Sequence, residues 1–439
     1  MIPSSSSCFS IWAVVVTVYP CWAKRRMAAS RASSRRVMGQ QSVLTAISFK
    51  RPSVAPIGPV GHHRGMRIAD FGVEIWMNRW ETRCRYNLAE TCVDSVTVAE
   101  LLALAGLDPT DLAAELAPMR LGYGAIEGSD RLRAAIAARY ETVRPEQVVV
   151  AHGAIGANHL AYEALIEPGD IVVSIVPAYQ QHVAVPESLG AEVRQVRLRE
   201  AEGWRLDLDE LAEAARGAKL ISLTNPNNPT GALLDPDALA RIAVIAGREG
   251  AWILADEVYR GIDQADPGTS PSFADLYPRT IAIGSMSKAF SLAGLRLGWI
   301  IAPTDVLEAV SRHRDYSVIS VGMVDDLLAA IALEHADAML TRNRAIVRSN
   351  LAVLDGWVAE EPRISYVKPV AGTTALLRFD AAMTAEVFCT RLLEAEGVLF
   401  VPGGAFDTEG VVRIGYANDP AVLTAGLERT SAFLATLDA

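Results

Sequence analysis

A lysine whose neighbours suit a reactive amine stands at position 288. It lies in Ser285–Trp299 (SMSKAFSLAGLRLGW), a stretch of small and apolar residues with no carboxylate. Most lysines are solvated surface residues, but apolar surroundings lower the pKa of an ammonium, and a neutral amine is a nucleophile. Arg296 adds a fixed cation, and Ser285 and Ser287 add hydroxyls. We therefore expect an amine that forms a Schiff base with a carbonyl, beside side chains that hold a phosphate.

Four more polar side chains lie in or just after segments that are expected to form strands. Residues of these types more often have an ordinary structural role, as a turn residue, a solvated acid or a surface arginine. Ligands of α/β sheets, however, bind at the carboxyl ends of strands, so these side chains are expected to meet in one site. They are Asn228 in the string NPNNPTG after the strand 220–223, Asp256 and Tyr259 after the strand 252–255, and Arg413 in the run 411–416.

A loop of small residues follows the strand expected over 148–150. In this loop (HGAIGA), Gly153, Ala154 and Ile155 let backbone N–H groups approach a phosphate at the start of a helix. The loop is also similar to the dinucleotide-binding G-x-G-x-x-G pattern, but one glycine is missing and the strand lies mid-chain, so that interpretation is weak. Tyr179 ends the next strand-loop unit, where an aromatic side chain is more often part of the core.

Together these segments resemble the class I/II aminotransferases, the aspartate aminotransferase superfamily of fold type I pyridoxal-phosphate (PLP) enzymes. The resemblance rests on S-x-S-K followed by G-x-R-x-G, and on N-P-x-N-P-T-G, and it covers roughly residues 67–436. It implies an α/β fold, with a large domain built on a doubly wound, mostly parallel sheet and a smaller α/β domain made from both chain ends. The implied boundaries are an extension over 1–65, small-domain parts over 66–115 and 319–439, the latter including an interdomain helix, and a large domain over 116–318.

The resemblance also implies a role for each site residue. Catalysis would rest on Lys288, Asp256 and Tyr259: the lysine binds PLP covalently and moves a proton, and the carboxylate meets the pyridine nitrogen. Tyr179 would stack on the ring, and Arg413 would pair with the substrate carboxylate. The implied cofactor-binding set is Gly153, Ala154, Ile155, Tyr179, Asn228, Asp256, Tyr259, Ser285, Ser287, Lys288 and Arg296, with Tyr123 from the neighbouring subunit of a homodimer; the implied substrate-binding set is Arg413, Asn228, Ala89 and Glu90.

The expected reaction moves the amino group of an amino acid to a 2-oxo acid. Elimination, cyclisation or oxidation on the same fold is the alternative, because the arm Trp76–Leu101 resembles that of capreomycidine-synthase-like enzymes, which act on a hydroxylated arginine. In the arm, LAETCV (88–93) departs from the usual L-x-x-G-E-P. A remote alternative is a ligand-sensing regulator, which would need an N-terminal DNA-binding helix-turn-helix; residues 1–65 lack the helical periodicity for one.

Glu90 stands on that arm and leaves two interpretations open. Its carboxylate is either solvated or bonded to Arg83 or Arg85, or it faces the substrate side chain and favours a cationic or hydrogen-bond-donating amino acid. In the second case Glu90→Gln should weaken catalysis with arginine-like donors by about 1–3 kcal/mol and spare neutral ones.

Composition limits the class of protein. The chain has 439 residues, a net charge of −10 and 51% hydrophobic residues, which fits a soluble enzyme of two or three domains without nucleic-acid partners. Five scattered cysteines indicate reduced cytoplasmic thiols, and neither a disulfide framework nor a metal site is expected.

Residues 1–69 are unlike the rest, with ten Lys or Arg and no Asp or Glu. The apolar run Ile11–Trp22 is too short to span a bilayer. The segment is typical of a transit peptide, or of a start codon placed upstream of the true start at Met66. We expect it to be disordered, and a chain starting at Met66 to keep its stability and activity.

Local patterns predict the elements that position the site. Helices are expected over 76–86, 98–104 and 130–140, the last capped by Ser129 or Asp130, and a long helical stretch from about Pro303. Apolar, β-branched runs predict strands over 148–150, 171–175, 193–196, 220–223, 252–255, 281–283, 297–301, 375–379 and 411–416.

Overall fold

The computed structural model describes residues 68–437, so the expectations for the N-terminal extension lie outside the described residues. A seven-stranded sheet forms the centre of the fold, in the order β2-β8-β7-β6-β5-β3-β4. Pairs from β7 to β4 are parallel, whereas β8 is antiparallel to both β7 and β2. The strands are β2 (Val148–His152), β3 (Ile171–Val176), β4 (Glu192–Arg197), β5 (Leu220–Thr224), β6 (Trp252–Asp256), β7 (Thr280–Ser285) and β8 (Leu297–Ile301).

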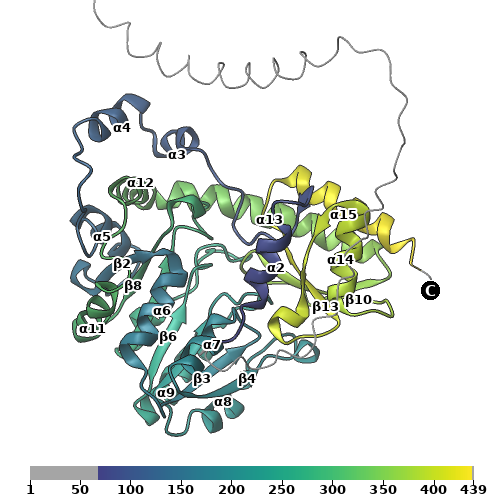
Figure 1. Ribbon diagram of the computed structural model, residues 1–439, viewed down its shortest axis with the longest axis horizontal. Coiled ribbons are helices and arrows are strands. Elements are labelled where there is room, and N and C mark those ends of the chain that lie inside the picture. Colours follow the sequence, from purple (N-terminus) through teal and green to yellow (C-terminus); the bar gives the residue numbers. More distant parts are fainter. Residues whose placement is uncertain (1–67, 438–439) are drawn as a thin grey trace, which may run out of the picture. The chain divides into compact units, whose positions relative to one another are not determined.

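Helices cover both faces of this sheet because its inner strands are apolar on both sides. In β6, Ile253 and Ala255 pack into one buried cluster, and Trp252 and Leu254 pack into another on the opposite face. Each fully buried aliphatic side chain contributes roughly 1.5–3 kcal/mol. The predicted doubly wound, mostly parallel sheet is confirmed (Figure 1). Its helices are α5 (Asp130–Ala137), α6 (Gly153–Leu165), α7 (Gln181–Ser188), α8 (Leu208–Ala214), α9 (Pro236–Glu249), α10 (Phe273–Leu276), α11 (Thr304–Arg314) and α12 (Met323–Glu334).

Both ends of the described chain meet in smaller sheets. Residues 86–87 pair with 398–399 in parallel, and a four-stranded antiparallel sheet has the order β12-β13-β10-β9. This pairing places the segment that follows it in the chain, residues 88–93, beside the large sheet; we call this segment the arm. The elements are α2 (Gly72–Trp80), β1 (Tyr86–Asn87), α3 (Val98–Ala105), α4 (Pro109–Leu116), α13 (Ala336–Glu360), β9 (Ile364–Tyr366), β10 (Thr374–Phe379), α14 (Ala385–Glu396), β11 (Val398–Leu399), β12 (Val401–Pro402), β13 (Val411–Gly415) and α15 (Pro420–Leu434).

All nine predicted strands are present within one or two residues, but two helices were predicted with wrong bounds. The helix expected over 76–86 spans Gly72–Trp80, because the apolar positions that bury it, Val73 and Trp76, lie at its start. The helix expected over 130–140 ends at Ala137. Its N-cap is Ser129, whose hydroxyl accepts the Leu132 N–H.

Neither a membrane-crossing helix nor a metal-binding cluster is present in the part of the chain that the structure describes. No helix within residues 68–437 is long and apolar enough to cross a bilayer. The same residues contain no group of three His, Cys, Asp or Glu side chains able to hold a metal ion. Their three cysteines, Cys84, Cys92 and Cys389, are unpaired.

Glu257, at the end of β6, is a buried acid that should make stability depend on pH. Its Oε1 accepts hydrogen bonds from Ser272 and Phe273, while its buried Oε2 has no partner. Burial raises the pKa of Glu257 to about 7. The folded state therefore holds this proton more tightly than the unfolded chain, and stability falls as pH rises from about 4.5 through about 7.

We expect Glu257→Gln to remove this pH dependence. Between about pH 5 and pH 8, the parent should lose on the order of 2 kcal/mol of unfolding free energy that the variant keeps, since glutamine carries no charge to desolvate. Urea unfolding of both proteins at the two pH values measures the difference. If the unfolding free energies of the parent and the variant change equally with pH, the pKa of Glu257 does not differ between the folded and unfolded chain.

Candidate active site

A pocket of about 320 Å³ opens at the carboxyl ends of β5, β6 and β7. It lies between the large sheet, α2 and the arm 88–93. Of the residues predicted for the site, Gly153 and Tyr123 are not in its wall. The predicted residues that line it are Ala89, Glu90, Ala154, Ile155, Tyr179, Asn228, Asp256, Tyr259, Ser285, Ser287, Lys288, Arg296 and Arg413.

One end of the pocket has the geometry of an anion site. Helix α6 begins at Gly153, whose φ of +65° suits glycine, and a Cβ there would lie 2.9 Å from Nη2 of Arg296. The guanidinium therefore lies directly over the N-terminus of α6, where free N–H groups and the helix dipole favour negative charge. Ser285 and Ser287 line the same end, with the Ser287 N–H donating to Ser285 Oγ at 2.9 Å.

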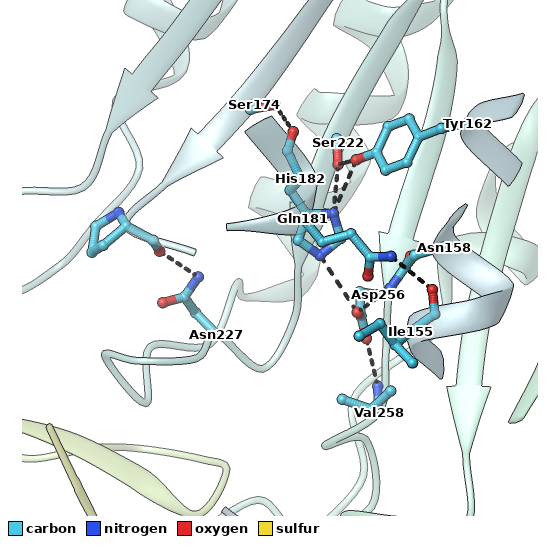
Figure 2. A network of polar contacts seen from close by, with 11 residues as sticks. Ile155, Asn158, Tyr162, Ser174, Gln181, His182, Ser222, Asn227, Asp256 and Val258 are labelled. Carbon is cyan, nitrogen blue, oxygen red and sulfur yellow. Dashed lines mark hydrogen bonds and ion pairs between the residues drawn. The ribbon is translucent and has the colours of Figure 1, made fainter. Parts of the chain in front are cut away.

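Asp256 lies at the base of the pocket, held by a buried polar network (Figure 2). Its Oδ2 accepts a 2.8 Å hydrogen bond from Asn158 Nδ2 and lies 3.4 Å from Nε2 of His182. The other ring nitrogen of His182, Nδ1, is 3.0 Å from the Tyr162 hydroxyl and 3.1 Å from Ser222 Oγ. The other carboxylate oxygen, Oδ1, accepts the Val258 N–H at 3.3 Å, so both oxygens of Asp256 are held in place.

Sequence reasoning missed Asn158 and His182. Asn158 lies one helical turn after Ile155 on α6, and His182 follows Tyr179 by three residues. Both side chains are buried, at 1% exposure. Their positions next to predicted site residues were the only available signal, and no motif marked them.

The surroundings of Lys288 differ from the prediction. Its Nζ donates to Thr91 Oγ1 at 2.6 Å and lies 3.5 Å from Cys92 Sγ, both on the arm. Burial by itself lowers the pKa of Lys288. Cys92, Tyr259 and Glu90 raise this pKa by more than burial lowers it, so the net pKa is above the ordinary value. The expected lowered pKa is therefore wrong for the protein without a bound cofactor, because Cys92, Tyr259 and Glu90, which come from distant segments, act on the amine.

Glu90 is not bonded to Arg83 or Arg85, so that expectation is wrong. Its Oε1 accepts the N–H groups of Thr91 at 2.8 Å and Cys92 at 3.0 Å, which fixes the arm against Lys288. Burial raises the pKa of Glu90, but Lys288 and these hydrogen bonds outweigh it, and the pKa is lowered. The two arginines lie over aromatic rings instead: Arg83 over Trp80 and Arg85 over Tyr86.

Arg413 is a buried cation with unused donor capacity. Nη2 donates to Ala89 O at 2.9 Å and Nη1 to Asn228 Oδ1 at 3.3 Å, whereas Nε has no partner within residues 68–437. The side chain is 3% exposed, and burial lowers its pKa. A buried unpaired donor on a pocket wall indicates a ligand that accepts from it.

Tyr179 and Tyr259 line the pocket as rings with fixed orientation. The Tyr179 hydroxyl donates to Glu74 Oε1 at 2.5 Å, and its ring lies 4.6 Å from that of Phe71, centroid to centroid. Tyr259 is 2% exposed, and burial raises its pKa, so its hydroxyl stays protonated near neutrality. Tyr123, by contrast, is 80% exposed and does not reach the pocket of its own chain.

The residues present fit pyridoxal phosphate. The anion site formed by α6, Arg296 and the two serines suits its phosphate. Asp256 suits a protonated ring nitrogen, and Lys288 suits its aldehyde. Four residues that line the pocket carry a buried polar atom with no hydrogen-bond partner among the described residues: Asn158 Oδ1, Gln181 Oε1, Thr224 Oγ1 and Arg413 Nε. Such atoms are expected where a ligand completes the site.

Comparison with known proteins agrees with this geometry. The family model "Aminotransferase class I and II" matches residues 87–429. Capreomycidine synthase of Streptomyces vinaceus is 34% identical over 367 residues, which are 83% of this chain and 93% of that protein. A crystal structure of a PLP-dependent aminotransferase from Streptococcus suis is 42% identical, with a TM-score of 0.82, covering 85% of this chain and 100% of that one.

A second solved structure, of the PLP-dependent cyclase OrfR, is 30% identical with a TM-score of 0.78, and covers 85% of this chain and 99% of that one. The family model matches most of the chain and includes every segment that builds the pocket wall except α2 and its C-cap residue, Glu81. The chain therefore belongs to the class I and II aminotransferases, pyridoxal-phosphate-dependent enzymes of fold type I.

Proposed function

We propose that this pocket transfers the amino group of an amino acid to a 2-oxo acid, with Lys288, Asp256 and Arg413 in the principal roles. The observation that supports this proposal is their convergence on one cavity from three distant segments. When bound, pyridoxal phosphate supplies the electron sink that allows the Cα–H bond to break. Each of the three side chains then acts on a different part of the reaction.

Arg413 binds the substrate α-carboxylate. Its unpartnered Nε and its Nη atoms form the planar fork that matches a carboxylate, and Ala89 O and Asn228 Oδ1 hold that fork in place. Because this cation is buried, the pairing is strong and fixes the Cα beside Lys288. Asn228 and Tyr259 would supply hydrogen bonds to the phenolic oxygen of the cofactor.

Lys288 carries the proton between Cα and the cofactor carbon as its free amine. Thr91 Oγ1 holds Nζ in position at 2.6 Å. Asp256 keeps a negative charge at the base of the pocket and favours the protonated ring nitrogen. The residues that would hold the phosphate of the cofactor are Gly153, Ala154, Ile155, Ser285, Ser287 and Arg296, and Tyr179 would stack on its ring.

A panel of amino acids tests this proposal. Purified holoenzyme is mixed with each amino acid, and conversion of the cofactor to its amine form is followed by absorbance. We expect one class of amino acid to convert it, and a 2-oxo acid to reverse the change. If a 2-oxo acid never restores the absorbance, the protein is not a transaminase.

Elimination or cyclisation is a second candidate, favoured by the similarity to capreomycidine synthase and the cyclase OrfR. The two reactions differ in atom balance. Transamination replaces the amino group of the donor with an oxo group, whereas cyclisation of a hydroxylated arginine with loss of water keeps every nitrogen. Mass spectrometry of the product formed from a hydroxylated arginine distinguishes them.

We propose that the enzyme works as a cytoplasmic homodimer in amino acid biosynthesis, its small domain being built from 66–115 and 319–439 around a large domain over 116–318. Exposed apolar side chains support the dimer: Leu121 is 83% exposed, Tyr123 80% and Tyr316 97%. Leu121 and Tyr123 belong to one loop. In the dimer, Tyr123 would reach the phosphate site of the neighbouring subunit.

Mixing of two inactive variants tests this arrangement. Tyr123→Ala leaves its own lysine intact, and Lys288→Ala leaves its own tyrosine intact. A mixed dimer therefore contains one complete site, and random reassociation should restore about a quarter of the parent activity. Activity that stays at the level of the separate variants would show that Tyr123 serves its own subunit or none.

A further inference from the structure

Three glutamates form one wall of the pocket, and we call Glu74, Glu81 and Glu90 the acidic wall. Glu74 lies on α2 and Glu81 is the C-cap residue of that helix, and they share one face because positions 74, 77 and 81 follow the helical spacing of three and four residues. Met77 lies between them and also lines the pocket. Glu90 comes from the arm opposite, so carboxylates face the cavity from two separate segments.

Among the described residues, no lysine or arginine forms an ion pair with this wall. Glu81 has no ion pair and no side-chain hydrogen bond, and Glu74 accepts only the Tyr179 hydroxyl. Burial together with Glu90 and Glu74 raises the pKa of Glu81, as expected where carboxylates crowd each other. The nearest arginines on the chain, Arg79 and Arg83, lie over the Trp80 ring instead.

The cations that do line the pocket are committed to other groups. They are Lys288, Arg296 and Arg413. Under the proposed function, on which this inference rests, Arg296 faces the phosphate, Lys288 the cofactor carbonyl and Arg413 the substrate α-carboxylate. The negative charge of the wall then remains for the substrate side chain to neutralise.

A second observation shows that a ligand belongs beside this wall. Arg413 is 3% exposed, and its Nε lacks a partner among residues 68–437 while the side chain lines the same cavity. Glu74 and Glu90 act on this guanidinium electrostatically. A free amino acid held there by its α-carboxylate therefore lies within the field of the wall.

We propose that the acidic wall selects an amino acid with a cationic side chain, and that Glu81 is its principal determinant of specificity. Glu90 already gives one oxygen to the N–H groups of the arm, and Glu74 gives one to Tyr179. Glu81 is an exposed residue, and neither of its carboxylate oxygens has a partner in the described chain. A guanidinium or ammonium gains charge-assisted hydrogen bonds there, whereas an acidic side chain is repelled.

Arginine and citrulline test the proposal, because they share a shape and differ in charge. With the holoenzyme, kcat/KM of the first half-reaction should favour arginine by at least about tenfold. Glu81→Gln should reduce this ratio about tenfold, because arginine loses a charge-assisted hydrogen bond whereas citrulline keeps a neutral one. Glu81→Lys should lower arginine further and raise glutamate. Glu428→Gln, which removes the same charge from an exposed position on α15, should leave the ratio unaltered.

The outcomes separate this inference from the proposed function. If citrulline or glutamate serves the parent as well as arginine, or if Glu81→Gln behaves like Glu428→Gln, the acidic wall does not select the substrate. If no amino acid changes the spectrum of the bound cofactor, the proposed function itself fails. Binding of cofactor by the Glu81 variants, read from absorbance, confirms that they fold.

Discussion

Replacing Lys288 with alanine should reduce turnover by several orders of magnitude while the protein still binds pyridoxal phosphate. The expected loss is large because, under the proposed function, one side chain carries two functions, the covalent attachment of the cofactor and the movement of the proton at Cα. Binding should persist, because the anion site at α6 and Arg296 does not involve the lysine. Folding should also persist, since an alanine fits where a side chain borders a cavity.

Borohydride reduction provides a readout independent of activity. In the parent it should attach the cofactor to Lys288, and peptide mass spectrometry should locate the modification. The described chain has two other lysines, Lys219 and Lys368, and Lys368 pairs with Asp355 at 2.6 Å. Lys219→Ala is therefore a matched control and should keep full activity and labelling. Label on Lys219 or Lys368 would overturn the assignment of Lys288.

Asp256→Asn should lower kcat by about a thousandfold or more, on the order of 4 kcal/mol of transition-state stabilisation. Asparagine keeps the shape of the side chain but cannot hold a negative charge beside the cofactor ring nitrogen. It also places a neutral amide where Asn158 and His182 are arranged around a carboxylate. The cofactor should therefore bind with a changed absorbance and a changed pH dependence of its spectrum.

The neighbouring acid supplies the control for this variant. Glu257 is equally buried, at 5% exposure, but it does not line the pocket. Glu257→Gln should keep turnover near the parent value and change only the pH dependence of stability. Comparable losses of activity in both variants would mean that Asp256 supports the fold of β6 and not the chemistry.

The strands and the site motifs could be predicted because both depend on short-range information. A buried parallel strand needs a continuous apolar run, and Ile253–Ala255 in β6 has one. The side chain that follows such a strand emerges at its carboxyl end, which is why Asp256, Asn228 and Lys288 share one pocket. The bounds of α2 were less predictable, because tertiary packing of Val73 and Trp76 decides where that helix starts.

The amino-acid sequence by itself determined the doubly wound sheet, the residues at its strand ends and the lysine on the loop after β7. Only the tertiary structure decided what surrounds that lysine. Thr91 lies 197 residues away along the chain, yet the parallel pairing of β1 with β11 brings its arm to within 2.6 Å of Lys288. The same approach brings Cys92 and Glu90 of the arm near the amine, and together with Tyr259 they reverse the predicted pKa shift of Lys288. Local sequence gives the desolvation of a side chain, whereas the charges that act on it arrive through contacts between distant segments.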